Sequence, residues 1–232
     1  MRRFDLILKG GHLIDPAQCL DRVMEVGFLD GKVVEIAEKI SGSLKTKTVD
    51  VTGCYVTPGL IDLHTHVYWG GTSLGVDAEN YCRKSAVTTV IDTGSSGPGN
   101  FLGFRKHIIE KSSVNILAFL HISHAGIYAF SDRVMVGESE NIKMMDPKTA
   151  IDVIRANKDC VVGIKVRLGK QTSGDNGIYP LAIAKKVAEK TNMPIMVHID
   201  EAPPSYSEVL AQMRPNDILT HCFRPSPNSP LD

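Results

Sequence analysis

The first 55 residues carry short runs in which apolar and polar side chains alternate. The stretch FDLILKGGHLID, residues 4–15, alternates in this way. In residues 25–40, Asp30-Gly31 separates two apolar runs, and this dipeptide in such a setting is a strong hairpin signal. The pattern predicts a small unit of β-strands, and small sheets need a partner surface to be stable.

From residue 56 onward, apolar and β-branched runs alternate with stretches of helical periodicity. Continuous apolar runs are typical of parallel strands that are covered on both faces. Strand and helix in alternation predict an α/β fold with right-handed crossovers. The predicted strands are 55–64, 87–94, 115–123, 160–167, 194–200 and 217–223, and the predicted helices are 77–86, 100–113, 146–158, 179–192 and 205–214.

Six strands and five helices are fewer than a (β/α)8 barrel requires, since such a barrel has eight of each in typically ~250 residues. The pattern therefore predicts a TIM-like barrel that is incomplete, with about six strands, or a smaller open α/β sheet. We place the domain boundary so that residues 1–55 form the β unit and residues 56–232 form the partial barrel.

Composition and charge indicate which classes of partner and which compartment to expect. The chain has 26 Lys plus Arg and 26 Asp plus Glu, so its formal net charge is zero and favours neither nucleic acid nor an anionic membrane. Five scattered cysteines indicate a reducing compartment, and neither a signal peptide nor an apolar run long enough for a bilayer is evident. We expect a cytoplasmic protein that acts on a small molecule, and a homo-oligomer is left open.

Histidines collect at the ends of the predicted strands. His64 and His66 end the first strand, His198 ends the fifth and His221 ends the sixth, while Lys165 lies inside the fourth. Functional residues of a parallel barrel sit at the carboxyl ends of its strands, and residues i and i+2 of a strand point the same way. The pattern predicts that these five side chains meet at one site.

Each of these signals is weak by itself. A lone His-x-His pattern is more often chance than metal, and a strand-end lysine often extends its amine to solvent. Taken together, four imidazoles and one lysine among apolar neighbours predict a metal site. Neutral imidazoles and oxygen anions are ligands that suit Zn²⁺ or a similar first-row ion.

The sequence VTPGLIDLHTH, residues 56–66, resembles the first-strand signature of the amidohydrolase superfamily, in which Pro-Gly precedes an apolar-Asp-x-His-x-His strand. VVGIKVR, PIMVHI and DILTHCF extend the match through strands four, five and six. The chain is similar to dihydroorotase-like members, and among them to deacetylase-like and D-aminoacylase-like enzymes. The resemblance covers most of residues 1 to about 223. It implies a TIM-like metal-dependent hydrolase barrel and the N-terminal half of a composite β-sandwich.

The resemblance also implies roles for individual residues. His64 and His66 would bind the more buried ion, His198 and His221 the more exposed one, and Lys165, carboxylated by CO₂, would bridge the two. The implied reaction is hydrolysis of a non-peptide amide or an ester by a hydroxide held between two divalent ions, with Zn²⁺ expected. N-acyl amino acids, other acetylated compounds and cyclic amides such as dihydroorotate are candidate substrates.

One element of the family pattern has no match in this sequence. Family members carry an aspartate at the end of strand eight, which binds metal and acts as general acid and base. Asp232 lies in NSPLD, which does not read as a strand, so we assign no catalytic residue. We expect a chain that stops after barrel strand six. The alternatives are a catalytically inactive fragment of such an enzyme and, as a third possibility, an open-sheet binding module.

Two further residues are candidates for orienting a ligand or the substrate. Asp62 precedes His64 by two positions and shares its face, where it would orient the imidazole or serve as an ordinary buried acid. Arg167 follows Lys165 by two positions, where it would bind a substrate carboxylate or form a surface salt bridge. His121 and His124, near the end of the third strand, are expected in loop or supporting roles.

Overall fold

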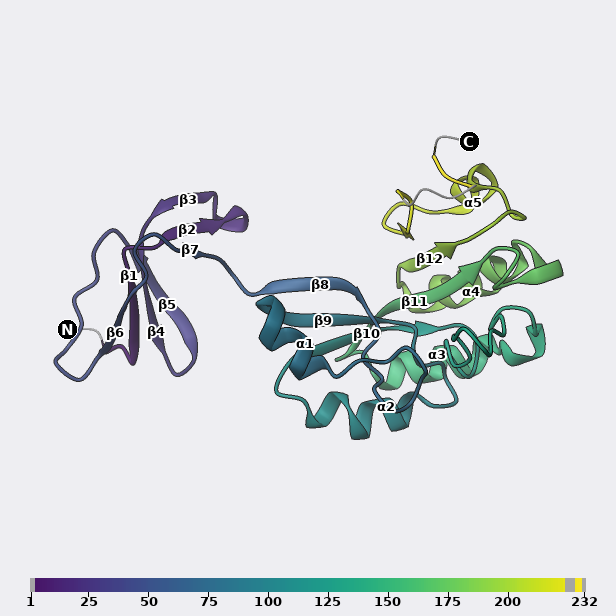
Figure 1. Ribbon diagram of the computed structural model, residues 1–232, viewed down its shortest axis with the longest axis horizontal. Coiled ribbons are helices and arrows are strands. Elements are labelled where there is room, and N and C mark those ends of the chain that lie inside the picture. Colours follow the sequence, from purple (N-terminus) through teal and green to yellow (C-terminus); the bar gives the residue numbers. More distant parts are fainter. Residues whose placement is uncertain (1–2, 224–227, 231–232) are drawn as a thin grey trace. The chain divides into compact units, whose positions relative to one another are not determined.

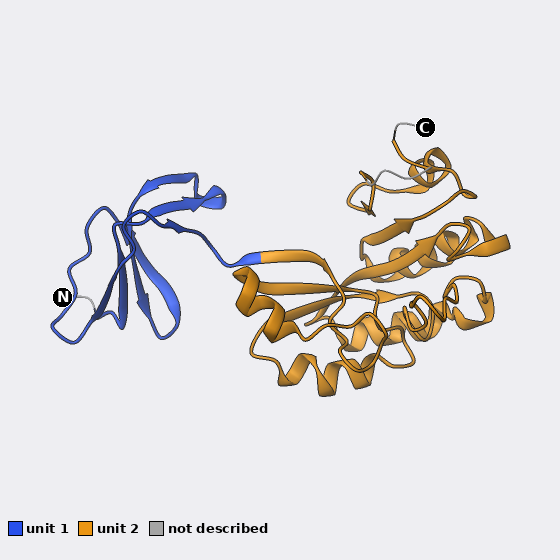
Figure 2. Cartoon of the chain, viewed as in Figure 1, with its two compact units in different colours: residues 1–60 blue, residues 61–232 orange. Residues whose placement is uncertain are grey.

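The computed structural model describes residues 3–223 and 228–230 (Figure 1). The chain divides into two compact units, Met1–Leu60 and Ile61–Asp232, which Figure 2 distinguishes by colour. The sequence placed this boundary after residue 55. The division falls later because Tyr55–Val56 forms a short strand of the first unit and the first barrel strand begins only at Leu60.

The first unit is made of two small sheets, as the alternating pattern predicted. One has the order β5-β4-β1-β6 and the other the order β3-β2-β7. Asp30 and Gly31 both have positive φ, 50° and 73°, as the two-residue turn between antiparallel β4 and β5 requires. The strands are β1 Leu6–Lys9, β2 His12–Asp15, β3 Leu20–Val23, β4 Glu25–Leu29, β5 Lys32–Ala37, β6 Lys47–Asp50 and β7 Tyr55–Val56, and a 3-10 turn covers Pro16–Gln18.

The second unit contains a six-stranded sheet with the order β13-β12-β11-β10-β9-β8. Strands follow each other in space as they do in sequence, and β9 to β13 pair in parallel, as expected for successive right-handed crossovers. This arrangement confirms the incomplete, six-stranded barrel. The strands are β8 Leu60–Thr65, β9 Val87–Thr93, β10 Asn115–His121, β11 Val161–Leu168, β12 Ile195–Ile199 and β13 Ile218–Thr220.

Five helices connect these strands near the places that the sequence predicted. Helix α3 begins where expected, because the Asp146 carboxylate accepts bonds from the first free backbone N–H groups and Pro147 occupies the first helical position. The predicted helix 100–113 is shorter and ends in a 3-10 turn. The helices are α1 Ala78–Ser85, α2 Phe101–His107, α3 Pro147–Ala156, α4 Tyr179–Thr191 and α5 Tyr206–Gln212, with 3-10 turns at Ile109–Lys111, Ile142–Met144 and Gly174–Asn176.

The main hydrophobic core lies between the helices and one face of the sheet, where Figure 1 shows α2 and α3 running along the strands. Side chains such as Ile164, Val166 and Val197 point into it. Because strand side chains alternate, their neighbours Lys165, Arg167 and His198 belong to the opposite face. A small apolar cluster of Ile91, Phe119 and Met196 forms the floor of that second face. Among the described residues, no helix has the length and apolar character needed to cross a bilayer.

Helix α2 offers a matched test of this packing. Phe104 is fully buried in the core, whereas Leu102 is 69% exposed on the same helix. We expect Phe104→Ala to lower the free energy of unfolding by about 3–5 kcal/mol and Leu102→Ala to change it by less than about 0.5 kcal/mol. Chemical denaturation followed by the fluorescence of Trp69 measures both. Equal effects of the two substitutions would contradict the assignment of this helix face.

Candidate metal and active site

The four predicted histidines lie at or just after the carboxyl ends of their strands, and Lys165 lies inside its strand. His64 is in β8 and His66 follows it, Lys165 is in β11, His198 is in β12, and His221 follows β13. The predicted sixth strand reached residue 223, but β13 ends at Thr220, since His221 takes a left-handed backbone conformation with φ 64°. Arg167 of β11 is paired with His198 of β12, so the two side chains lie on the same face of the sheet.

The four imidazoles form a continuous array. Ring centroids are 5.5 Å apart for His64 and His66, 4.8 Å for His64 and His221, and 4.7 Å for His198 and His221. β8 and β13 are the two outer strands of the sheet, so these contacts require the sheet to curl until its edges approach each other at this end. The curvature is that of a barrel wall.

A cavity of about 600 Å³ opens at this end of the sheet. All five predicted ligand residues line it, and so do the candidates Asp62 and Arg167. Apolar side chains cover another part of the wall, namely Leu74, Val76, Ile127 and Phe130. A mostly apolar cavity with a few convergent polar groups is the usual form of a small-molecule site.

His64 and His66, in β8 and just after it, are held in their neutral form. Burial lowers the pKa of His64 to about 3 and that of His66 to about 2, and the nearby positive charge of Lys165 adds to both shifts. A neutral imidazole keeps a lone pair on one nitrogen, and this lone pair is what binds a metal ion. Both rings are therefore neutral near pH 7, the form in which an imidazole can bind a metal ion.

Lys165 is the most unusual group of the site. It is 1% exposed, and its amine has no hydrogen-bond partner among the described residues. Burial, with a smaller contribution from the charge of Arg167, lowers the pKa of Lys165 to about 7. A buried amine of this kind is largely neutral above pH 7, and a neutral amine is nucleophilic. The orphaned nitrogen fits a position that carries a further group.

Two hydroxyl groups contact the first histidine pair from outside the cavity lining. His64 Nδ1 lies 2.7 Å from Thr220 Oγ1, and His66 Nδ1 lies 2.9 Å from Ser95 Oγ. Both contacts are hydrogen bonds between side chains that are far apart in sequence. They hold the two rings in fixed orientations.

Asp62 forms a hydrogen bond with the backbone of His64. One carboxylate oxygen accepts a bond from the backbone N–H of His64 at 3.0 Å, and the other accepts a bond from the hydroxyl of Tyr81. Tyr81 also lines the cavity. Asp62 thus has the position of a group that orients the β8 strand end through the backbone of His64.

Arg167 forms a salt bridge with Glu138, as one of its two expected alternatives had it, but this salt bridge is buried and not on the surface. Arg167 is 4% exposed, and its guanidinium lies 3.3 Å from Glu138 and 5.0 Å from the ring centre of Phe130. His121, which ends β10 and is fully buried, has its Nε2 atom 3.4 Å from the same glutamate. Burial raises the pKa of Glu138. The hydrogen bond with His121 and the positive charge of Arg167 lower it by more, so the pKa is lowered overall. Glu138, in the long loop after β10, is therefore held by His121 and by Arg167, which lines the cavity.

Comparison with known proteins identifies the sequence family. Residues 55–215 match the model of the amidohydrolase family. The chain belongs to this family. It is 36% identical to a deacetylase of Agrobacterium fabrum over 84% of this chain and 47% of that protein. Two solved structures superpose with a TM-score of 0.85 and cover 97% of the chain, a dihydroorotase at 30% identity over 59% of its length and an adenine deaminase at 34% identity over 58%.

The family assignment confirms the resemblance and the barrel fold that the sequence predicted. This amidohydrolase chain spans about half the length of the curated deacetylases it matches. The names of its relatives cover more than one reaction. Family and fold are thus established, whereas substrate and activity of this chain are matters of inference.

Sequence reasoning overlooked several polar residues of the amidohydrolase site. Glu138, Ser95 and Thr220 were not singled out, because each lies in a loop or at a strand end without a recognisable motif. Glu138 meets Arg167 from 29 residues away, and Thr220 meets His64 from 156 residues away. Only the polar character of position 220, next to His221 at the end of a predicted strand, gave any signal.

The lowered pKa of Lys165 predicts how stability depends on pH. Below pH 7 the amine is protonated in both the folded and the unfolded state, and above pH 10.5 it is neutral in both. Between these values only the unfolded state holds the proton, so the metal-free chain should gain about 1.4 kcal/mol of stability per pH unit from this group. We expect Lys165→Met to remove this gain.

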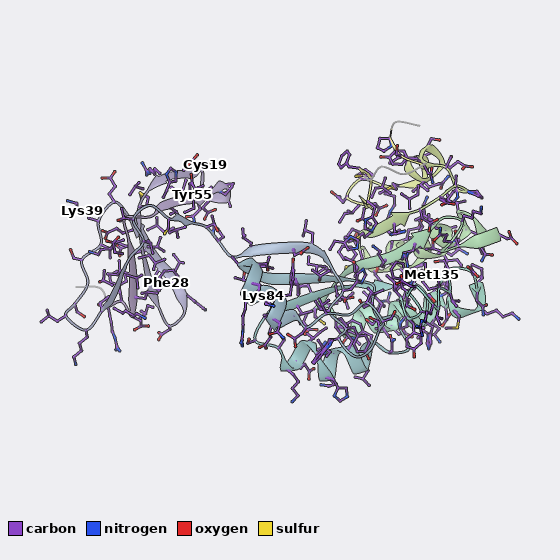
Figure 3. All side chains as sticks on the ribbon, viewed as in Figure 1. Cys19, Phe28, Lys39, Tyr55, Lys84 and Met135 are labelled. Carbon is purple, nitrogen blue, oxygen red and sulfur yellow. The ribbon has the colours of Figure 1, made fainter. Side chains whose placement is uncertain are left out.

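The measurement is urea denaturation of the chelator-treated wild type and Lys165→Met at several values from pH 6 to pH 10. The stability difference between the two proteins should be largest at pH 7 or below and shrink by a few kcal/mol as pH rises. Lys84→Met is the matched control, since Lys84 is exposed on α1 (Figure 3). A difference that does not vary with pH would show that Lys165 titrates normally.

Proposed function

We propose that this chain carries the metal-binding half of a hydrolase active site that cleaves amide or ester bonds of small molecules outside peptides. The observation that carries the proposal is the meeting of four imidazoles with the buried amine of Lys165 in one cavity, where this amine has no hydrogen-bond partner among the described residues. Membership of the amidohydrolase family supports it, as does the likeness to a deacetylase and a dihydroorotase.

The residues present fit a pair of divalent ions, with Zn²⁺ the expected metal. His64 and His66 would hold one ion, His198 and His221 the other, and Lys165 would contribute to both as a carbamate formed with CO₂. Within residues 3–223 and 228–230, no three His, Cys, Asp or Glu side chains form a cluster suited to one ion. Two histidine pairs joined by a lysine agree with that finding, because each ion would have only two such ligands.

Ions bound there would supply Lewis acidity toward the substrate carbonyl and the attacking water. The chain's own groups have other tasks. Neutral imidazoles provide lone pairs, the apolar wall excludes water, and Arg167 presents N–H donors to an anionic or carbonyl oxygen of the substrate. Asp62 and Tyr81 orient the strand end that carries His64. No residue is assigned as general acid and base, and Asp232 lies outside the described residues.

Metal content tests the proposal directly. The chain purified from zinc-supplemented culture should hold about one to two equivalents of zinc, measured by plasma mass spectrometry. The double variant His64→Ala/His66→Ala should lose at least half of this zinc. His107→Ala is the control, because this histidine is exposed on α2. Less than half an equivalent in folded wild-type protein would contradict the two-ion site.

Activity is tested on the same preparations. N-acetyl amino acids, acetate esters and dihydroorotate form the substrate panel, and a chelator should abolish any hydrolysis. Zinc binding without hydrolysis of any panel member would support the alternative of an inactive chain.

A further inference from the structure

The two hydrogen bonds between hydroxyl groups and histidines have a common geometry. Each bond reaches the Nδ1 atom of a histidine at the end of β8, and the two hydroxyl groups come from the ends of two other strands. Ser95 follows β9, the inner neighbour of β8, and Thr220 ends β13 at the opposite edge. Both contacts therefore depend on the curled sheet and not on local sequence.

The Ser95 hydroxyl is held rigidly. Ser95 is fully buried, and its backbone N–H donates to Asp92 Oδ1 at 2.8 Å. The second carboxylate oxygen, Asp92 Oδ2, accepts a bond from the backbone N–H of Val67 at 2.8 Å. Val67 directly follows His66, so one buried carboxylate fixes both the residue that carries the hydroxyl and the residue beside the ring. The backbone segments that carry Ser95 and His66 are thereby tied to one carboxylate and held close to each other.

The Thr220 hydroxyl is placed by sheet pairing. Thr220 is in register with His198 of β12, and it immediately precedes His221. Its bond to His64 thus connects the ends of β12 and β13, where His198 and His221 lie, with the end of β8, where His64 and His66 lie.

Neighbouring hydroxyl groups behave differently. Thr65 Oγ1 donates to the carbonyl oxygen of Ile91, and Thr93 Oγ1 donates to the carbonyl oxygen of Thr65. Ser96, next to Ser95 and equally buried, has no hydrogen-bond partner for its hydroxyl among the described residues. Of the five hydroxyl groups of Thr65, Thr93, Ser95, Ser96 and Thr220, those of Ser95 and Thr220 contact an imidazole.

A neutral imidazole carries one proton, and the hydrogen bond at one nitrogen selects which nitrogen keeps it. A hydroxyl oxygen at Nδ1 can accept this proton in a hydrogen bond. The Nε2 atom then keeps its lone pair. The other tautomer would place the proton on Nε2 and would prevent this nitrogen from binding a cation.

We propose that Ser95 and Thr220 are positioning residues that accept hydrogen bonds from the Nδ1–H groups of His66 and His64 and so present both Nε2 lone pairs to a cation. The nature of the cation rests on the proposed function. The tautomer itself is a property of the metal-free chain and can be measured without any ligand.

The first arm of the test uses metal-free protein. Long-range ¹H–¹⁵N correlation spectra of the ¹⁵N-labelled chain report the protonated nitrogen of each ring, and His64→Gln and His66→Gln identify the two signals. We expect both rings to carry the proton on Nδ1, which is not the tautomer that a free histidine side chain favours in water. Ser95→Ala should change the signals of His66, and Thr220→Val those of His64.

Matched variants separate this role from general packing. Ser96→Ala removes a buried hydroxyl next to Ser95. Thr89→Val repeats the threonine-to-valine substitution at another position of the sheet, and Thr220→Ser keeps the hydroxyl at position 220. All three should preserve the wild-type tautomers. A proton on Nε2 of both rings in the wild type would overturn the proposal even if every variant failed to fold.

The second arm measures Co²⁺ affinity by competition with a chromophoric chelator. Ser95→Ala and Thr220→Val should each bind Co²⁺ about 10–100-fold more weakly than wild type, as is usual when the partner of a ligating histidine is removed. Thr220→Ser and Ser96→Ala should bind normally. Unchanged affinity in both hydroxyl deletions would contradict the proposal. A wild-type chain that binds no Co²⁺ would contradict the proposed function instead, while the tautomers would still decide the positioning role.

Discussion

The burial of the Lys165 amine is the constraint on which the rest of the site depends. The amine sits on the face of β11 opposite the helices, 1% exposed and without a hydrogen-bond partner among the described residues. A protonated amine in this setting costs several kcal/mol, which is why its pKa falls to about 7. Conversion to a carbamate would exchange an unfavourable cation for an anion with two oxygen ligands.

The histidines follow from the same constraint. Burial lowers the pKa of His64 and His66, and the positive charge nearby makes their protonation still less favourable. Both rings are therefore neutral near pH 7, and Ser95 and Thr220 lie where they would select the nitrogen that faces a cation. Arg167, balanced by Glu138 and stacked on Phe130, remains charged beside the amine. Charge, burial and hydrogen bonding thus act together in one cavity.

Much of this arrangement was predictable because it follows from strand periodicity. The pairs His64 with His66 and Lys165 with Arg167 are each two residues apart, so they share a face wherever the strand forms. The hairpin at Asp30-Gly31 and the cap of α3 at Asp146 are equally local. The contacts of Glu138 and Thr220 depend on how a loop folds back and how far the sheet curls, and no local pattern encodes either. The end of β13 at Thr220 was not predicted either. The next residue takes a left-handed backbone conformation, which a glycine would have indicated in the sequence, but this residue is His221.

The most direct test of this account is ¹³C NMR of the chain incubated with zinc and ¹³C-labelled bicarbonate. The amine and CO₂ would form a carbamate and release one proton. We expect one carbamate resonance per chain, which disappears in Lys165→Met and persists in Lys84→Met. A zinc-loaded wild-type chain that shows no such resonance would contradict the claim that the buried amine of Lys165 exists to carry a bridging group.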